Sequence, residues 1–483
     1  MIERISIKRT LHLLALSAVL WSGAVPTPGA ATYAYIPDYE GRQVIRIATA
    51  APSTGRVAVG LSCKPYGAAV APDGTYLLVT CHAPDALVLL GDADFDAAAP
   101  SPLVDGALVG NTPLGVTIDP TGSFAYVANS DDQDGQGRGT VYRIDTRTLD
   151  VGSITVGRAP WGIAALYDEI NERIKVYVAN HLDNTVTVIS DDGTGTFPPP
   201  ITVDVGQEPI GVAVSPDGRY AYVANFRGGG QGSVSVIRTS DDAVIQTIAV
   251  DHGPWGVAAS IHASLQGANG YTFVSNSKNE LRPDIDPGKV AVLRHDKDWD
   301  SDPHILLSPL PNVGVAPLGG AAPRNGRFAY LVNDQGTISK VSVRDDQSLE
   351  VTTIQVPEMD RAYALGAFIG GRPPAAPSGF TAEATSYDRI QLAWTDNSSD
   401  PLKALGVKIE RRRKGARTFT EIVRVPAGTT TYRDAPLQSD TTFEYRIRAY
   451  NEAADSAYVT PRETEVTTEK GGFSWCFIQT LRH

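Results

Sequence analysis

The 483-residue chain is short of cysteine, of positive charge and of long apolar runs, and each shortage excludes a class of protein. Its 3 cysteines are too few for a scaffold built on disulfides. Its 42 Lys and Arg residues are outnumbered by 54 Asp and Glu, which gives a net charge of −12. That balance excludes a nucleic-acid partner, because neutralising phosphates requires a basic face. Beyond residue 31, no stretch approaches the roughly eighteen apolar residues that a membrane-spanning helix needs.

Several catalytic signatures are also missing. The sequence has no Gly-x-Ser-x-Gly elbow, no His-Glu-x-x-His and no phosphate-binding loop, so nucleophilic catalysis of the trypsin or lipase type has no support. The lack of Cys-x-x-Cys-His excludes covalently attached c-type haem. What is present is a hydrophobic content of 42%, enough for a packed core, with 46 Gly and 33 Pro. This composition suits many short strands joined by tight turns.

The N-terminus has the pattern of a secretory signal peptide. Positive residues stand at its start, a mostly apolar run covers Leu11 to Val25, and small residues follow at Gly29 to Ala31. The run is too short for a comfortable membrane span, and an uncleaved anchor is the alternative. We predict a signal peptide over 1–31 and a mature chain without a membrane span, which is secreted, periplasmic or on the cell surface.

A repeat fills the next part of the chain. Relatives of the segment VGQEPIGVAVSPDGRYAYVAN, Val205 to Asn225, recur along it. The Gly of each Pro-x-Gly corner, or of its degenerate equivalent, marks seven copies: Gly67, Gly115, Gly162, Gly211, Gly256, Gly319 and Gly366. Their spacing of 45 to 63 residues is the length of four short strands with turns, the unit of a propeller blade. Alternating small and β-branched residues favour crowded strands near a central axis.

The two ends of the repeat region complete one another. Residues 34–38 resemble a second strand that lacks a first, and Tyr363–Ile369 is a first strand with nothing after it. Joining them makes a seventh blade and hides the sheet edges that an open array would expose. We therefore predict an all-β fold with a seven-bladed β-propeller over 32–371, closed by the N- and C-terminal strands in one blade. An open β-solenoid is the alternative.

The strands that end in Tyr-Val-x-Asn resemble the repeat of the YVTN family of β-propeller proteins. Three of them stand at Tyr126–Asn129, Tyr177–Asn180 and Tyr222–Asn225. Families of this shape include secreted and surface-layer proteins, lactonase-like enzymes and redox subunits. The resemblance therefore implies the fold and leaves the function open.

A Pro-rich linker at 372–378 precedes a second predicted domain at 379–468. The strand that ends in Trp394, the turn at Thr431-Tyr432 and the sequence FEYRIRAYN at 443–451 resemble a fibronectin type III domain. That resemblance implies an immunoglobulin-like β-sandwich.

The remaining residues, 469–483, form a Gly/Cys tail. The sequence around Cys476 resembles a terminal motif of some exported bacterial proteins, but the longer extension that normally follows is missing. Whether this tail is an attachment signal stays open.

Two cysteines flank the first complete repeat. Cys63 lies two residues before Pro65 at the start of the innermost strand, and Cys81 occupies the Asn position that ends the neighbouring strand. Antiparallel pairing brings those ends together, so we predict a disulfide worth roughly 3 kcal/mol. The alternatives are two buried thiols or a metal pair with His82.

Corners and second-to-third-strand loops of a propeller share one face. The ligand-binding residues predicted on this face are Tyr66, His82, Trp161, His181, Phe226, His252, Trp255 and Asp334. Three His and two Trp around one central funnel could bind a ligand or a transition metal. Alternatively, the Trp residues cap the inner strands and the His residues point into solvent.

Calcium is the one cofactor that the sequence suggests. The residues Asp296, Asp298, Asp300 and Asp302 alternate through one loop, and hard oxygen ligands at short spacing suit this ion. A solvated turn is the alternative.

These features favour a secreted, monomeric, non-catalytic binding or scaffold protein. We expect its propeller face to recognise an extracellular protein or polysaccharide, with the fibronectin type III domain as a spacer or second contact. One alternative is a lactonase-like hydrolase or redox accessory with a site in the His/Trp funnel, and another is a structural component of the cell envelope. Two imidazoles and a carboxylate that converge within about 4 Å of a common point would favour the enzyme.

Overall fold

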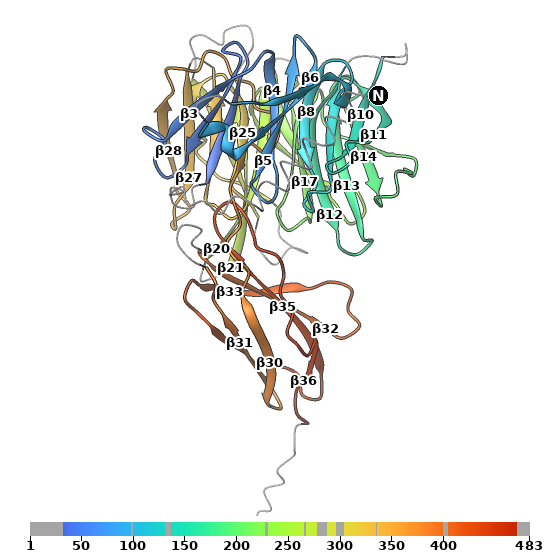
Figure 1. Cartoon of the computed structure of the whole chain (residues 1–483), viewed down its shortest axis with the longest axis vertical. Coiled ribbons are helices and arrows are strands. Elements are labelled where there is room, and N and C mark those ends of the chain that lie inside the picture. The colour runs from blue at the N-terminus through green and yellow to red at the C-terminus, as the bar shows by residue number, and fades with distance from the viewer. Residues whose placement is uncertain are drawn as a thin grey trace, which may run out of the picture. The chain divides into compact units, whose positions relative to one another are not determined.

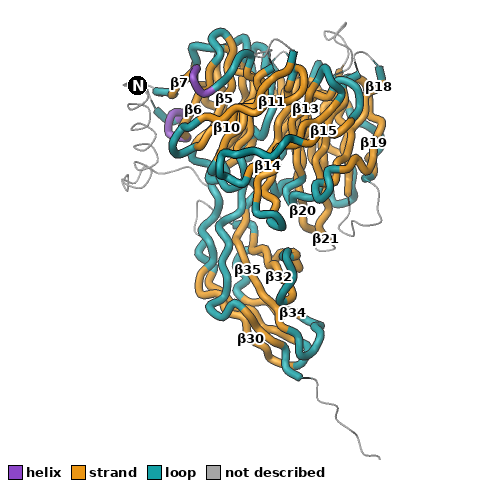
Figure 2. Tube along the Cα trace, turned by 90° about the vertical axis from the view of Figure 1, so that its right-hand side faces the viewer, coloured by secondary structure: helices purple, strands orange, loops and turns teal. Residues whose placement is uncertain are grey.

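The computed structural model describes residues 32–97, 100–130, 137–227, 230–264, 267–277, 287–295, 304–334, 336–398 and 404–470. The described residues up to Arg372, with Glu452–Ala454, form one compact unit, and those from Pro373 onward form another. The predicted signal peptide and Cys476 lie outside the described residues. Regular structure is almost wholly β, with two short 3₁₀ helices, η1 (Asp92–Phe95) and η2 (Gly106–Leu108) (Figure 2). Within these parts of the chain, no helix has the length and apolar character needed to cross a bilayer.

Seven antiparallel sheets build the first unit as far as it is described. Six of them use strands that are consecutive in sequence, as hairpin-linked sheets do. Their strands are β4 (Lys64–Val70), β5 (Tyr76–His82), β6 (Ala86–Gly91) and β7 (Leu103–Asp105); β8 (Pro113–Ile118), β9 (Phe124–Asn129), β10 (Arg138–Asp145) and β11 (Val151–Arg158); β12 (Pro160–Asp168), β13 (Arg173–Asn180), β14 (Thr185–Asp191) and β15 (Ile201–Asp204); β16 (Pro209–Val214), β17 (Tyr220–Asn225), β18 (Gln231–Arg238) and β19 (Ala243–His252); β20 (Pro254–Ser264), β21 (Gly267–Asn276), β22 (Pro287–His295), β23 (Ile305–Leu306) and β24 (Asn312–Val315); and β25 (Pro317–Ala321), β26 (Phe328–Asn333), β27 (Thr337–Val343) and β28 (Leu349–Gln355).

The seventh sheet, here called the closing sheet, joins the two ends of the repeat region. Its strands are β29 (Ile369–Gly370), β1 (Tyr33–Asp38), β2 (Gln43–Ala48) and β3 (Arg56–Gly60). The Tyr35 N–H donates to the Phe368 carbonyl at 2.9 Å, and the Tyr39 N–H donates to the Arg361 carbonyl at 2.7 Å. In Figure 1 the blue strand β3 lies beside the gold strand β28, where the Arg56 side chain donates to the Gln355 carbonyl.

The Gly of each corner is required because the inner strands pack too closely for a side chain. A Cβ atom at Gly115 would stand 2.4 Å from the Trp161 carbonyl oxygen, and one at Gly211 would stand 2.3 Å from that of Trp255. Real Cβ atoms do not approach so closely, so each corner rests on the backbone of the next. A Cβ atom at Gly366 would stand 2.5 Å from the Ala68 carbonyl oxygen, so the last corner packs against β4, the first inner strand of the series.

In four of the corners the sharp turn comes from the residue before Pro and not from the Gly of the corner. Thr112, Ala159, Glu208 and Ala316 have φ values of 47°, 48°, 51° and 43°. The left-handed backbone reverses the chain as it enters the inner strand. The sequence did not predict this left-handed residue, because the residue before Pro differs from repeat to repeat and only the Gly recurs.

The Tyr of the Tyr-Val-x-Asn strand crosses to the following sheet. The Tyr126 hydroxyl donates to Asp191 at 2.6 Å, and the Tyr177 hydroxyl donates to Asp242 at 2.7 Å. Burial raises the pKa of both tyrosines far above the ordinary value, so their hydroxyls stay protonated donors. Tyr35, Tyr222 and Tyr330 reach the next sheet in the same way.

The Asn that ends the same strand forms a hydrogen bond to the preceding sheet at Asn129 and at Asn180. The Gly110 N–H donates to Asn129 Oδ1 at 2.9 Å, and the Gly157 N–H donates to Asn180 Oδ1 at 3.1 Å. This seam of hydrogen bonds joins the last strand of one sheet, or the link that follows it, to the second strand of the next. The side-chain amide of the Asn also donates to a hydroxyl of the third strand, as Asn180 does to Thr187 at 2.8 Å and Asn225 does to Ser235 at 3.0 Å.

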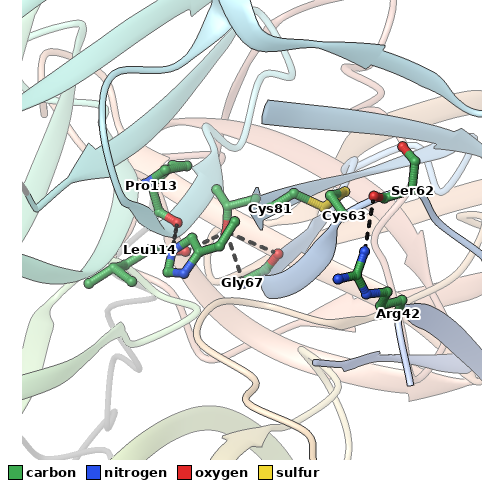
Figure 3. Close-up of a disulfide and its surroundings, with 9 residues drawn as sticks. Arg42, Ser62, Cys63, Gly67, Cys81, Pro113 and Leu114 are labelled. Carbon is green, nitrogen blue, oxygen red and sulfur yellow. Dashed lines mark hydrogen bonds between the residues drawn. A yellow bond between two sulfur atoms is a disulfide. The ribbon is translucent and has the colours of Figure 1, made fainter. Parts of the chain in front are cut away.

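The predicted disulfide is confirmed and occupies the same seam. Cys81 stands at the Asn position, and Cys63 lies in the link from the closing sheet to β4, with the two Cα atoms 5.6 Å apart. Figure 3 shows this bond beside Ser62, whose carbonyl accepts a hydrogen bond from Arg42. A covalent bond thus replaces the Asn–Gly hydrogen bond between these two sheets.

The second unit contains two antiparallel sheets. One joins β30 (Ser378–Ser386), β31 (Arg389–Thr395) and β34 (Thr431–Asp434), and the other joins β33 (Thr420–Pro426), β32 (Gly406–Arg413), β35 (Thr442–Tyr450) and β36 (Glu465–Thr467). Trp394 and Ile447 lie in the core that the two sheets share. The basic run at 411–414 is matched by carboxylates, since Arg412 pairs with Glu444 at 2.6 Å.

Candidate functional site

An aromatic and aliphatic cluster gathers the corner residues of the sheets in the first unit. The residue between Pro and Gly is at the same register in each inner strand, so the ring of inner strands brings these residues to one place. We call this cluster the aromatic mouth. Its members are Tyr66, Leu114, Ile210, Phe226, Trp255 and Leu365, with Tyr39, Trp161, Leu318 and Tyr363 packed against them.

The rings of the mouth pack on one another without interruption. Tyr66 stacks on Tyr363 with ring centres 4.9 Å apart and an interplanar angle of 9°. Trp161 meets Tyr66 at 6.5 Å and Trp255 at 5.5 Å, both edge to face, and Trp255 meets Phe226 at 5.7 Å. Tyr66 and Trp255 are only 7% and 5% exposed. The predicted funnel is therefore filled by side chains.

Other members keep part of their surface open to solvent. Tyr39, His82, Trp161, His181 and Tyr363 are half-buried. His82 stacks on Tyr66 at 5.3 Å, and His181 lies 5.2 Å from Trp161. Two ion pairs are formed by residues close to these in sequence, Lys64 with Glu40 at 2.7 Å and Arg158 with Asp183 at 2.5 Å. A third, between Lys289 and Asp251 at 3.0 Å, lies close to Trp255 in sequence.

The three predicted histidines have separate partners. His82 Nε2 lies 2.9 Å from the Pro113 carbonyl oxygen, and His181 packs on the Trp161 ring. His252 is half exposed, with its Nδ1 atom 2.9 Å from Asp251 Oδ1. Hydrogen bonds from His252, together with Lys289, lower the Asp251 pKa to about 2, although burial opposes this shift.

No metal centre is formed by these groups. In the parts of the chain that the structure describes, no three His, Cys, Asp or Glu side chains are grouped so that they could hold an ion. The predicted calcium ligands Asp296, Asp298, Asp300 and Asp302 lie outside the described residues.

A hollow of about 450 Å³ adjoins the segment that leads into the closing sheet. Asp334, the last of the predicted ligand-binding residues, lines it and accepts hydrogen bonds from Arg361 Nε and Nη2 at 3.2 and 3.3 Å. Glu40, Gln355 and Asp360 are further polar residues of its wall. Glu40 follows Tyr39 directly in the chain, which places the hollow beside the aromatic mouth.

The backbone of the hollow's wall is fixed by hydrogen bonds to a buried carboxylate. Asp38 is completely buried, and its carboxylate accepts the Asp360 N–H at 3.2 Å and the Gln43 side chain at 2.9 Å. The Gln43 amide also donates to the Glu358 carbonyl at 2.7 Å. These bonds join the start and the end of the repeat region.

Sequence analysis missed the residues that come from the closing sheet, above all Tyr39, Tyr363 and Arg361. Tyr39 follows Asp38, which stands at the Asn position, so it is equivalent to His82 and His181 in their repeats. Extending the repeat register into the closing sheet would have found it. Arg361 lies outside any repeat position and carries no such signal.

Comparison with known proteins identifies the architecture only. The sequence matches no protein-family model and no curated protein sequence. Among solved structures, a functionally unknown protein from Desulfotomaculum acetoxidans is 14% identical, has a TM-score of 0.52, and covers 71% of this chain and 100% of its own. A "putative 6-phosphogluconolactonase" from Bacteroides uniformis is 15% identical, has a TM-score of 0.51, and covers 69% of this chain and 98% of its own. These likenesses show a propeller-like all-β fold and nothing of function.

Proposed function

We propose that this chain is a non-catalytic binding or scaffold protein that uses the aromatic mouth to recognise an extracellular protein or glycan. The observation that carries this proposal is the set of half-buried rings, Tyr39, His82, Trp161, His181 and Tyr363, on a rigid, tightly packed base. Aromatic side chains surrounded by polar groups are characteristic of recognition surfaces, where large rings supply most of the binding energy.

We further propose that the seven sheets are the seven blades of a closed propeller of the YVTN type. The Tyr and Asn contacts between successive sheets, and the glycine contacts between inner strands, support this arrangement. In the same way, the two sheets around Trp394 support a fibronectin type III domain, which would serve as a spacer or second contact.

We also propose that the protein is exported. The Cys63–Cys81 disulfide supports this, because such bonds persist in oxidising compartments and are rare in the cytosol. The signal pattern at the N-terminus points to the same compartment.

The alternatives receive less support. A lactonase-like hydrolase or redox accessory needs groups that converge on one reacting point or metal. The described imidazoles of His82, His181 and His252 each have a different partner. The likeness to a protein described as a putative 6-phosphogluconolactonase concerns the fold alone.

The test of this proposal is a binding screen of the full chain against a glycan array and a displayed peptide library. Each ligand found is then measured with Trp161→Ala, which removes a half-buried ring from the mouth. The matched control is Tyr167→Ala, at the other end of β12, where the side chain is 38% exposed. We expect Trp161→Ala to weaken binding about tenfold or more and the control to leave it unchanged. Ligands that bind both variants equally well, or turnover of a sugar lactone by the wild-type chain, would refute the proposal.

A further inference from the structure

Resting on this recognition role, we infer that the hollow beside the aromatic mouth is a ligand subsite and that it takes a neutral oligosaccharide. Its volume of about 450 Å³ lies within the roughly 300–1,000 Å³ of typical small-molecule sites. Size alone does not define the ligand, whose chemical class follows from the side chains of the wall.

The wall offers both acceptors and donors of hydrogen bonds. The carboxylates of Glu40, Asp334 and Asp360 accept, while the side chains of Arg361 and Gln355 donate. A sugar hydroxyl both donates and accepts, and neighbouring hydroxyls match the two oxygens of a carboxylate. Planar side chains of this kind suit paired, directional bonds.

An aromatic surface lies next to these polar groups. The Tyr39 and Tyr363 rings meet edge to face, with centres 5.4 Å apart. The charges of Arg361 and Asp334, two residues of the hollow's wall, both act on the Tyr363 hydroxyl, so this ring adjoins the hollow. Burial raises the Tyr363 pKa, and the hydroxyl therefore stays protonated. The apolar C–H face of a pyranose can pack on such rings while its hydroxyls meet the wall.

The charge balance disfavours an anionic ligand. Three carboxylates face one guanidinium, and that guanidinium is already paired with Asp334. Two further cations near the wall are also paired, Lys64 with Glu40 at 2.7 Å and Arg56 with Glu358 at 3.0 Å. A phosphate or uronate group would therefore meet uncompensated negative charge.

A cationic ligand is disfavoured for a different reason. The Lys64 ammonium lies 4.7 Å from the centre of the Tyr39 ring, where a ligand cation would gain most from the aromatic face. Arg361 likewise already forms an ion pair with the Asp334 carboxylate. The chain's own cations thus fill these two positions, and a neutral hydroxyl-rich ligand fits what remains.

The site is held in place before any ligand arrives. The bond from the Asp360 N–H to the buried Asp38 carboxylate fixes the backbone of one wall. Two backbone carbonyls, of Val315 and Ala316, accept the Asp334 N–H at 3.0 and 3.1 Å and fix the opposite side. A preformed wall lowers the ordering cost of binding.

The experiment is calorimetric titration of the full chain with cellotetraose, xylotetraose, mannotetraose and chitotetraose. Tetragalacturonate and glucose 6-phosphate are the anionic probes, and tetralysine is the cationic probe. Asp360→Asn removes the charge and keeps the N–H that bonds Asp38, and Gln355→Ala removes an exposed donor. The control Asp204→Asn changes the same charge at an exposed site on β15.

We expect at least one neutral probe to bind, each hollow variant to weaken it about tenfold, and the control to change nothing. Tighter binding of an anion or of tetralysine would overturn the charge argument. Neutral binding that responds to Trp161→Ala but to neither hollow variant would overturn the subsite and leave recognition by the mouth standing. If no neutral probe binds while a peptide binds at Trp161, the saccharide is wrong and the recognition role survives. Failure of all ligands at both places would overturn both proposals.

Discussion

Acid should destabilise the first unit well above the pH at which carboxylates protonate, because two buried histidines must stay neutral. His295 and His304 are 3% and 5% exposed, with ring centres 5.2 Å apart. Burial lowers the His295 pKa to about 3, with His304 as a further cause, and burial lowers the His304 pKa to about 4. The Tyr222 hydroxyl, whose own pKa is raised by burial, donates to His304 Nε2 at 3.0 Å.

The sign follows from the protons that each state binds. In the unfolded chain both imidazoles titrate near pH 6.5, so between about pH 4 and pH 6.5 the unfolded state binds more protons than the folded state. The stability that these groups contribute is complete above about pH 6.5 and is lost as the pH falls below it. At about pH 5 each imidazole removes about 2 kcal/mol, or about 4 kcal/mol for the pair. The depressed Asp251 pKa of about 2 acts only at lower pH.

The assay is urea unfolding of the full chain at about pH 8 and about pH 5, with amide exchange of β22 as the local readout. The double variant His295→Asn/His304→Asn removes both titrating groups. We expect the wild-type chain to lose about 4 kcal/mol between the two pH values and the variant to lose less than about 1 kcal/mol. Equal wild-type stability at both pH values, or an unchanged pH dependence in the variant, would show that the two buried imidazoles do not cause the loss of stability in acid.

Two further predictions concern the seams between sheets. Replacing Cys63 and Cys81 by Ala should cost about 3 kcal/mol, as expected for a bridge over 18 residues, and urea unfolding in the presence of reductant should show the same loss for the wild-type chain but none for the variant. Tyr177→Phe leaves the buried Asp242 without its hydroxyl donor and should cost about 1–3 kcal/mol in the same assay, whereas Tyr167→Phe, at an exposed site, should cost nothing measurable. Equal effects of the two tyrosine variants would argue against the inter-sheet hydrogen bond.

The repeat register was enough to predict which corner residues meet. Tyr66, Trp161 and Trp255 occupy one position of the repeat, and the glycine contacts leave the inner strands no other arrangement. The way in which they pack was not predictable. The stacking of Tyr66 on Tyr363 depends on a closing segment that is irregular at Gly366, where φ is +119°.

The same limit applies to the histidines and to the crossing tyrosines. His82 and His181 are equivalent in register, and each ring lies against the corner aromatic ring of its own repeat, but the interplanar angle is 17° for His82 on Tyr66 and 36° for His181 on Trp161. The repeat register fixes the position of the Cα atom, whereas the neighbouring side chains determine the conformation of the side chain. Likewise the partners of the tyrosines differ from sheet to sheet: Asp191 ends strand β14, Asp242 lies in a turn, and Asp92 begins the helix η1.

The position that ends the second strand of each sheet links the stability of the ring to the candidate site. Asn129 fills it with a hydrogen bond, Cys81 with a disulfide, and Asp38 with bonds to the far end of the repeat region. Glu40, two residues after Asp38, shares the hollow with Arg361, so a ligand there would touch both ends of the closed chain. Such a ligand must stabilise the closed ring, by about 2.7 kcal/mol at a concentration one hundred times its Kd. If the proposed ligand binds there, recognition and closure are thermodynamically coupled at this position.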